Sequence, residues 1–280
     1  MTSPAATKPL YQQEESLRTH VARITSVRSF QLLSDAEKAL FKTGGDETCV
    51  IEANETIFYA QGGGQPFDTG LMASLGQQQH AGTDFMVEAV RNGSDGRILH
   101  FGHFSAGRKD TLKEGDMVEQ RIDATRRDLN SRIHTGGHII ALAVRRLVEK
   151  TAELEVTELK AQHYPDACFV EFKGVIDNKH KDAIQDQATK YVKNALPVKL
   201  NWYDPEELGA SGAITAEGMP IIAGIDGKVR VVDVVGAGAY PCGGTHVQDT
   251  SLVGQLVVKS IKRQKGNSKI SYSVQDGEQA

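Results

Sequence analysis

The pattern of apolar residues changes near residue 118, and this change constrains the fold more than any other feature of the sequence. Before it, short apolar runs alternate with glycine-rich turns, a pattern typical of short strands. The runs are TCVIEA (48–53), ETIFYA (55–60), FMVEAV (85–90) and RILHFGHF (97–104). We predict a small β-barrel domain over residues 19–118, preceded by a polar, disordered tail at residues 1–18.

After residue 118 the sequence becomes charged and helical. Asp123 or Thr125 can cap a helix that runs to about Lys150. A polar helix is expected near residues 177–195, among several strand-like runs. These runs are CFVEF (168–172), PVKLNWYD (197–204), VRVVDVV (229–235), QLVVKSI (255–261) and KISYSV (269–274). We therefore predict an α+β fold, in which a second domain (119–276) packs helices on an antiparallel sheet.

Composition excludes several classes of protein. The 280 residues are 39% hydrophobic and 24% charged, which is typical of a globular chain, and no run of about 18 apolar residues could cross a membrane. The first residues, MTSPAATKPLYQQEES, lack the apolar core of a signal peptide. Three widely separated cysteines, Cys49, Cys168 and Cys242, make a disulfide framework improbable and favour the cytoplasm. The net charge of −4 means that a nucleic acid would need a local basic patch.

Two histidines lie four residues apart in the predicted helix, in the segment RIHTGGHIIALAV. At 3.6 residues per turn, His134 and His138 project side by side, so both imidazoles can bind one metal ion. Gly136 and Gly137 each weaken a helix by about 1 kcal/mol, and close approach of a ligand or another backbone would explain them. Taken alone, the pair fits equally well a metal site and two histidines that fill polar gaps beside a core.

A second pair occurs in YPCGGTHVQD, where Cys242 and His246 are also four residues apart. Gly243 and Gly244 favour a turn here, and a turn can direct a thiolate and an imidazole to one point. One sulfur and three nitrogen ligands form a suitable zinc shell. We therefore predict zinc ligation by His134, His138, Cys242 and His246.

HTGGH, followed about a hundred residues later by CGGTH, resembles the metal-site signature of the alanyl-tRNA synthetase editing domain and of the free-standing AlaX trans-editing proteins. FYAQGGGQPFDTG (58–70) resembles the glycine-rich segment of that family's N-terminal barrel. RVVDVVGAGAYPCGGTHV (230–247) and KSIKRQKGNSKISYSV resemble its metal-bearing strand and its closing hairpin. The resemblance covers about residues 20–275, includes no class II aminoacylation segment, and implies a stand-alone deacylase.

The resemblance implies hydrolysis of the ester that joins a wrong amino acid, chiefly serine and sometimes glycine, to alanine tRNA. Such editing is needed because an alanine pocket rejects an added hydroxyl only weakly. Zinc could bind the seryl hydroxyl or amino group, polarise the ester or activate water, and these roles stay open. Four protein ligands form a closed structural site, whereas catalysis needs an open position. We therefore expect either that one candidate, His246 first, is not a permanent ligand, or that the metal only organises the pocket.

Other residues are predicted for supporting roles. Gln65 could position substrate, and the glycines Gly62, Gly63 and Gly64 would let the backbone approach an RNA end, although an ordinary turn explains them too. Thr135 and Thr245 could bind the seryl hydroxyl or simply cap turns. His100 and His103 fit a strand face and are predicted to be structural.

A basic window supplies the expected contacts to tRNA phosphates. This window runs from Gln255 to Lys269 without an acidic residue and contains Lys259, Lys262, Arg263, Lys265 and Lys269. Arg126, Arg127 and Arg132, which precede the histidine pair on its predicted helix, are also predicted to bind tRNA. Two other functions stay open: a non-catalytic tRNA-binding factor with a structural zinc, and a zinc hydrolase with a small-molecule substrate. The related editing domain of threonyl-tRNA synthetase leaves the identity of the tRNA less certain than the reaction.

Overall fold

A computed structural model describes residues 6–75, 84–105, 112–151, 153–209, 212–214, 224 and 226–276 of the chain. The chain divides into two compact units. The first comprises Met1–Gly62 and Pro66–Arg127, and the second comprises Gly63–Gln65 and Asp128–Ala280. The short segment Gly63–Gln65 therefore packs with the second unit although the first unit surrounds it in sequence.

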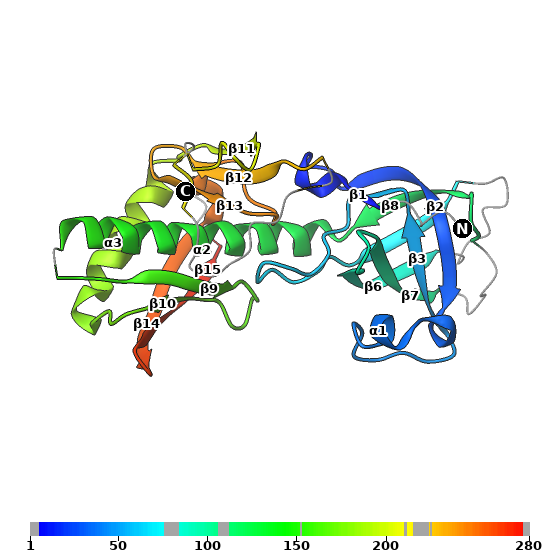
Figure 1. The fold of residues 1–280 in the computed structure, drawn as a ribbon, viewed down its shortest axis with the longest axis horizontal. Coiled ribbons are helices and arrows are strands. Elements are labelled where there is room, and N and C mark those ends of the chain that lie inside the picture. Colours follow the sequence, from blue (N-terminus) through cyan, green and yellow to red (C-terminus); the bar gives the residue numbers. More distant parts are fainter. Residues whose placement is uncertain are drawn as a thin grey trace. The chain divides into compact units, whose positions relative to one another are not determined.

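The first unit is a closed antiparallel barrel with strand order β2-β3-β7-β6-β5-β8 (Figure 1). Its strands are β2 (Thr19–Ser29), β3 (Thr48–Ala53), β5 (Gly70–Ser74), β6 (Phe85–Asn92), β7 (Ile98–Phe104) and β8 (Met117–Ile122). Alternate residues face the barrel interior, and Ile51, Met72 and Phe85 are fully buried there. Gly102 is required in β7, because a Cβ there would lie 1.8 Å from the carbonyl oxygen of Met86. The predicted barrel is confirmed.

Short elements complete this unit. They are β1 (Lys8–Pro9), η1 (Leu10–Gln12), η2 (Phe30–Leu32), α1 (Asp35–Lys38) and β4 (Glu55–Thr56). Strand β1 pairs with β4, and Leu10 and Tyr11 are buried in the barrel core. The prediction of a disordered tail is therefore wrong for residues 6–18, because two apolar side chains anchor that segment; residues 1–5 lie outside the described part.

The second unit packs two helices with two antiparallel sheets (Figure 1). The two α-helices are α2 (Ala124–Lys150), whose first residues belong to the first unit, and α3 (Lys181–Lys193); two short 3₁₀ helices, η3 (Asn178–His180) and η4 (Thr250–Val253), accompany them. One sheet has the order β14-β15-β10-β9 and the other β11-β12-β13. The strands are β9 (Thr157–Gln162), β10 (Phe169–Lys173), β11 (Val198–Tyr203), β12 (Val229–Val234), β13 (Gly238–Pro241), β14 (Gln255–Gln264) and β15 (Asn267–Gln275).

The core of this unit lies between α2, α3 and the sheets. Ile139, Ile140 and Leu142 of α2 pack with side chains such as Val170 and Ile270 of the four-stranded sheet. The predicted α+β class, with helices on antiparallel sheet, is confirmed.

The boundary between the units differs from the predicted one. It falls after Arg127 rather than after residue 118, because residues 117–122 form the barrel strand β8. Charged side chains in β8 alternate with the buried Val118, Gln120 and Ile122. The charged residues therefore lie on the face of the strand that is turned to solvent.

None of the three cysteines forms a disulfide, and Cys49 and Cys168 are buried as predicted. In the described part of the chain, no helix has the length and apolar character needed to cross a membrane.

Candidate metal centre

Helix α2 presents the first pair of candidate ligands. Asp123 caps it, accepting a hydrogen bond from the backbone N–H of Arg126 at 3.0 Å, as predicted for one of two possible caps. His134 and His138 follow on one face, with their rings nearly parallel and 5.1 Å apart between centroids. The helix thus fixes two imidazoles side by side in a largely buried position.

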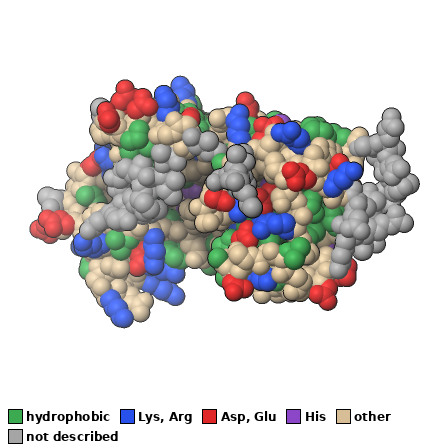
Figure 2. Space-filling model, turned by 45° about the vertical axis from the view of Figure 1, so that its right-hand side comes forward, with side chains coloured by type: hydrophobic (Ala, Val, Ile, Leu, Met, Phe, Trp, Pro, Cys, Tyr) green, Lys and Arg blue, Asp and Glu red, His purple; other side chains and the backbone are tan. Residues whose placement is uncertain are grey.

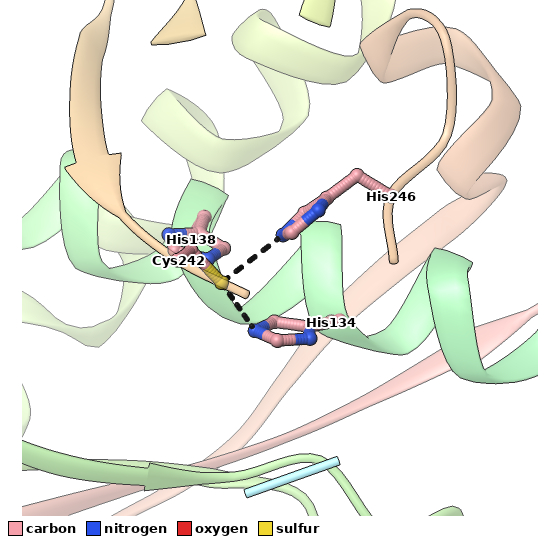
Figure 3. A group of neighbouring side chains, drawn as sticks. All are labelled: His134, His138, Cys242 and His246. Atoms are coloured by element: carbon pink, nitrogen blue, oxygen red, sulfur yellow. Dashed lines mark hydrogen bonds between the residues drawn. The ribbon is translucent and has the colours of Figure 1, made fainter. Parts of the chain in front are cut away.

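The turn after β13 brings the second pair to the same place (Figure 3). Sγ of Cys242 lies 3.4 Å from Nε2 of His134 and 3.7 Å from Nε2 of His246. Gly244 permits this approach, because a Cβ there would lie 2.2 Å from Cε1 of His134. One possible ligand atom from each of the four residues lies within 4.8 Å of the others. The structure therefore assembles the four predicted ligands, which come from segments about a hundred residues apart.

The spacing and chemistry of these atoms fit zinc. With Zn–S near 2.3 Å and Zn–N near 2.05 Å, a tetrahedral site has sulfur–nitrogen edges of about 3.6 Å, close to the separations found here. Nε2 of His138 is buried without a hydrogen-bond partner among the described residues, and a metal ion would supply that partner. The cluster can therefore bind a metal ion.

The protonation states also suit ligation. Burial opposes ionisation of Cys242, but the adjacent His134 and His246 outweigh it and hold the pKa of the thiol well below its ordinary value. Burial lowers the pKa of His134 to about 4, so its imidazole is neutral at physiological pH. A thiolate and neutral imidazoles are the forms that bind zinc.

Gln65 fixes the tautomer of His134. Its Oε1 accepts the backbone N–H of Thr245 at 3.0 Å, which establishes which side of the amide carries oxygen. The same oxygen lies 2.7 Å from Nδ1 of His134, so Nδ1 must carry the proton and Nε2 is left with a lone pair towards Cys242. Gln65 is fully buried and orients the candidate ligand His134. Its predicted role in positioning substrate stays a prediction.

Thr135 and Thr245 are likewise fully buried and occupied by structural hydrogen bonds. The Thr135 hydroxyl donates to the carbonyl of Ser131 and accepts the backbone N–H of Val247. The Thr245 hydroxyl accepts from Nε2 of Gln65 and pairs with the hydroxyl of Ser131. These bonds support the alternative prediction that the threonines stabilise local turns. Their contact with the seryl hydroxyl stays a prediction.

Two sequence families match the chain in the regions that carry these features. The family of tRNA synthetases class II (A) matches residues 4–126, and the threonyl and alanyl tRNA synthetase second additional domain matches residues 229–271, which include Cys242 and His246. The alanyl-tRNA editing protein AlaX-L of Pyrococcus horikoshii is 30% identical over 80% of this chain, and AlaX-M of Methanosarcina barkeri is 29% identical over 87%. The chain is a relative of the AlaX editing proteins. The resemblance drawn from the HTGGH and CGGTH motifs is thus confirmed.

The alanine–tRNA ligase of Thermotoga maritima is also similar, with 29% identity over 84% of this chain. The chain spans 50% of the length of AlaX-L and 26% of that ligase, but 96% of AlaX-M. The likeness to AlaX proteins and ligases therefore concerns the region that they share.

The glycine-rich segment before Gln65 approaches the protein's own backbone. Gly63 and Gly64 have φ of 51° and 79°, and a Cβ on Gly64 would lie 2.5 Å from the carbonyl oxygen of Ala161 in β9. The backbone N–H of His163 donates to the carbonyl of Gly64 at 2.9 Å. Gly62 has no contact of that closeness. The predicted close approach thus exists at Gly64, but its partner is strand β9 of the same unit. This supports the alternative prediction that the glycines form an ordinary turn.

His163 was not predicted from the sequence, and it packs directly on the candidate ligand His134. Its ring is buried and lies 4.1 Å from that of His134, at an interplanar angle of 22°. The Tyr272 hydroxyl donates its one proton to the carbonyl of Ile133, so Nδ1–H of His163 must donate to that hydroxyl. A Cβ on Gly137 would lie 2.3 Å from Cε1 of His163, which explains this helical glycine. Gly137 was the feature of the sequence that could have indicated a close neighbour here, although that neighbour is the His163 side chain rather than a ligand or a backbone.

Glu158 and Tyr240 were also missed. The Tyr240 ring lies 4.8 Å from that of His138, and its hydroxyl hydrogen-bonds Glu158. Burial raises the pKa of Glu158 to about 7, whereas the bond from Tyr240 acts in the opposite direction. A carboxyl group that can change protonation state near neutral pH thus lies one side chain away from a candidate ligand.

The arginines predicted to bind tRNA are engaged within the protein. Arg127 is fully buried, with its guanidinium 3.0 Å from Asp68 and 2.6 Å from the carbonyl of Ile57. Its prediction as an RNA contact is wrong, because a buried ion pair leaves no face for a phosphate. Arg126 donates to the carbonyl of Phe67 at 2.9 Å, and Arg132 donates to the carbonyls of residues 253 and 275 and to the carboxylate of residue 276. Both are partly exposed, so their contact with RNA stays a prediction.

The basic residues of the β14–β15 hairpin are exposed, as a surface for RNA requires. These residues are Lys259, Lys262, Arg263, Lys265 and Lys269. Figure 2 shows Lys and Arg side chains gathered at the lower edge of the left-hand part, where Figure 1 places the tip of this hairpin. Lys262 and Lys269 lie directly opposite each other, which concentrates positive charge on the outer face. The hairpin therefore remains a candidate for phosphate contacts.

The two barrel histidines are structural, as predicted. His100 is fully buried and bonded to Thr56 at 2.8 Å and to the carbonyl of Ile51 at 2.9 Å. His103 pairs with Glu88 at 3.1 Å on the barrel surface.

Proposed function

We propose that the chain is a zinc-dependent hydrolase that removes serine from mischarged alanine tRNA, with glycine as a further substrate to be compared. The observation that carries this proposal is the cluster of His134, His138, Cys242 and His246, whose possible ligand atoms lie within 4.8 Å of one another, with the pKa of the Cys242 thiol held well below its ordinary value. The names of the relatives AlaX-L and AlaX-M, alanyl-tRNA editing proteins, supply the substrate class. A cytoplasmic location, expected from the three unpaired cysteines, belongs to the same proposal.

The residues around the cluster suit this chemistry. Zinc held there would polarise the ester carbonyl or bind a polar group of the amino acid. Gln65 holds Nε2 of His134 in its unprotonated form, and the His163 ring restricts rotation of the same imidazole. Glu158, with a pKa near 7, can hold or release a proton close to the cluster. The chain thus offers a ligand set, its supports and an ionisable group within one unit.

The test is release of labelled serine from seryl-tRNA charged on alanine tRNA, beside correctly charged alanyl-tRNA. We expect release of serine but not alanine, and loss of that release in Cys242→Ala, which should remain folded but lose bound zinc. His100→Asn is the histidine control, because His100 is not a candidate ligand and its ring hydrogen-bonds to Thr56 and to the carbonyl of Ile51 in the barrel. If folded, zinc-loaded protein releases no serine yet binds the tRNA, the non-catalytic binding factor replaces the hydrolase. Zinc-dependent hydrolysis of small esters without any dependence on tRNA would instead favour the small-molecule hydrolase.

A further inference from the structure

The sheet β14-β15-β10-β9 has two different faces. On one face, Val170 and Phe172 of β10 and Ile270 of β15 pack in the core with side chains of α2 and α3. Phe169 and Glu171 alternate with those buried residues along β10, so they project from the opposite face, which we call the open face. The residues of the open face that concern us are Lys160, Phe169, Glu171, Lys262, Lys269 and Ser271.

One row of side chains crosses all four strands of the open face and is positively charged. The strand register gives the order Lys160, Glu171, Lys269, Lys262. Lys160 lies 3.3 Å from the carboxylate of Glu171, whereas the described residues place no carboxylate within ion-pair distance of Lys262 or Lys269. The row therefore carries a net charge of +2 (3 − 1), and both uncompensated charges belong to the β14–β15 hairpin.

The folded chain by itself does not explain why Lys262 stands directly opposite Lys269. Like charges at opposed positions of an antiparallel pair destabilise a sheet. Neighbouring strands lie about 4.8 Å apart, so the two flexible side chains can reach one anionic group together. A phosphate held between them would replace their repulsion with charge-assisted hydrogen bonds.

An aromatic ring lies beside these two lysines. Phe169 is partly exposed, and Nζ of Lys269 lies 3.7 Å from the centre of its ring. Ser271, directly opposite Phe169 in β15, adds a hydroxyl next to the ring. A sheet face that combines an accessible aromatic ring with cations is typical of surfaces for unpaired RNA, because the ring stacks on a base while the cations bind phosphates.

We propose that the open face binds unpaired nucleotides of RNA, with one base stacked on Phe169 and the adjacent phosphates held by Lys262 and Lys269. The base takes the place of the Lys269 ammonium group over the ring. This exchange is favourable, because stacking of a base on an aromatic ring is worth more than an exposed cation–π contact, and the displaced ammonium group binds phosphate instead. The inference rests on the proposed function only in taking tRNA as the RNA.

The open face contributes affinity and takes no part in hydrolysis. Helix α2, which carries His134 and His138, packs against the other face of the sheet. An RNA molecule bound to the open face is therefore held at a surface separate from the candidate ligands. Binding of uncharged RNA, rather than release of an amino acid, is the appropriate measurement.

The first experiment removes the aromatic ring. Phe169→Leu is compared with Tyr203→Leu, a partly exposed aromatic residue of the other sheet, by fluorescence anisotropy with labelled, uncharged alanine tRNA. Phe169→Leu should bind at least about fivefold more weakly than wild type, the loss expected for one stacked base, with an unchanged dependence on salt. Tyr203→Leu should stay within about twofold of wild type. Folding and zinc content are measured for every variant.

A fully paired RNA duplex serves as the second probe, because it offers no free base. Phe169→Leu should bind this duplex as wild type does. Equal binding of tRNA by Phe169→Leu and Tyr203→Leu would overturn the proposal. An equal loss for tRNA and duplex would also overturn it, because the ring would then contribute without stacking on a base.

A spectroscopic signature tests the stacking directly and includes a conservative replacement. The chain has one tryptophan, Trp202 in β11, so Phe169→Trp combined with Trp202→Phe places the single tryptophan on the open face. This variant should bind tRNA at least as tightly as Trp202→Phe alone, and its fluorescence should be quenched when tRNA is added. Binding without quenching would refute the stacked base.

The second experiment removes the opposed charges. Lys262→Gln with Lys269→Gln is compared with Lys190→Gln with Lys193→Gln, which removes two exposed charges from α3. The first pair should weaken tRNA binding at least about tenfold and lower the slope of log affinity against log salt by about 1.4, since each phosphate contact to a single strand contributes about 0.7. Its urea midpoint should not fall, because a repulsion has been removed.

Other outcomes of these measurements would overturn the proposal. Equal losses for the two double variants would show that only the net charge of the protein matters. Wild-type protein that sediments with vesicles of anionic phospholipid but binds neither RNA would assign the open face to a membrane surface instead.

The same measurements separate this proposal from the proposed function. If wild-type protein releases no serine from seryl-tRNA but the expected differences in binding are found, the hydrolase proposal fails and the RNA surface stands. If the hydrolase is active and each variant binds tRNA as its control does, the RNA surface is refuted.

Discussion

Gln65→Met tests whether the buried amide of Gln65 sets the tautomer of His134. In the native structure Oε1 accepts from Nδ1 of His134 at 2.7 Å and from the backbone N–H of Thr245 at 3.0 Å. Methionine fills a similar volume but accepts neither bond. Two buried donors are then left unpaired, at about 1–3 kcal/mol each, so the free energy of unfolding of metal-free protein should fall by about 2–6 kcal/mol.

The same substitution should weaken zinc binding. Without Gln65, the proton of His134 can move to Nε2, the nitrogen that faces Cys242. Loss of a group that orients a ligand typically costs 10–100-fold in metal affinity, about 1.4–2.7 kcal/mol. Competition with a chromophoric chelator measures this affinity directly and requires no enzymatic activity.

Gln65→Glu is the matched control. A carboxylate keeps both acceptor bonds, and the Thr245 hydroxyl, which accepts from Nε2 of Gln65, can rotate to donate instead. We expect this variant to bind zinc within about threefold of wild type. The reasoning is refuted if folded Gln65→Met binds zinc as tightly as wild type, or if Gln65→Glu loses as much affinity as Gln65→Met.

Three further substitutions test other parts of the structure, each by urea unfolding. Gly137→Ala should destabilise the protein by about 1–3 kcal/mol, because its Cβ would lie 2.3 Å from the buried imidazole of His163. At Gly136 the nearest atoms are 3.2 Å away, so Gly136→Ala should change the free energy of unfolding by less than about 1 kcal/mol, and equal effects of the two substitutions would contradict this. Arg127→Met leaves the buried carboxylate of Asp68 unpaired and should lower the free energy of unfolding by about 3–5 kcal/mol. Arg126→Met, at a less buried position, should lower it by less than about 1 kcal/mol. A small loss for Arg127→Met would show that the ion pair is dispensable. In metal-free protein, burial raises the pKa of Glu158 to about 7 from 4.5, so its stabilising contribution is complete below pH 4.5 and is lost as the pH rises through 7. The free energy of unfolding, relative to that of Glu158→Gln, should therefore fall by up to about 3 kcal/mol between pH 4.5 and 8. A difference that does not change with pH would show that the carboxyl group is solvated.

The regular elements follow from patterns within short segments, which explains why they could be predicted. TCVIEA is β3, and the segment from Asp123 to Lys150 is a capped helix, because side-chain alternation and capping depend on neighbours in sequence. Prediction failed where tertiary contacts decide the outcome. Residues 6–18 are ordered because Leu10 and Tyr11 find a place in the barrel core, and β8 is a strand because two barrel neighbours pair with it.

For the candidate site, the sequence by itself indicated the four candidate ligands, because a spacing of four residues on a helix, or across a tight turn, points two side chains to one place. Only the tertiary structure decided what surrounds them. Gln65, His163 and Glu158 reach the cluster from the glycine-rich loop and from β9, and no local pattern encodes contacts between segments so far apart. The burial of Arg127 could not be predicted for the same reason, because its ion-pair partner Asp68 is distant in sequence and comes close only in the folded chain. Spacing along the chain fixes which groups can converge, whereas burial and long-range hydrogen bonds fix their protonation, their orientation and the groups that remain exposed to a substrate.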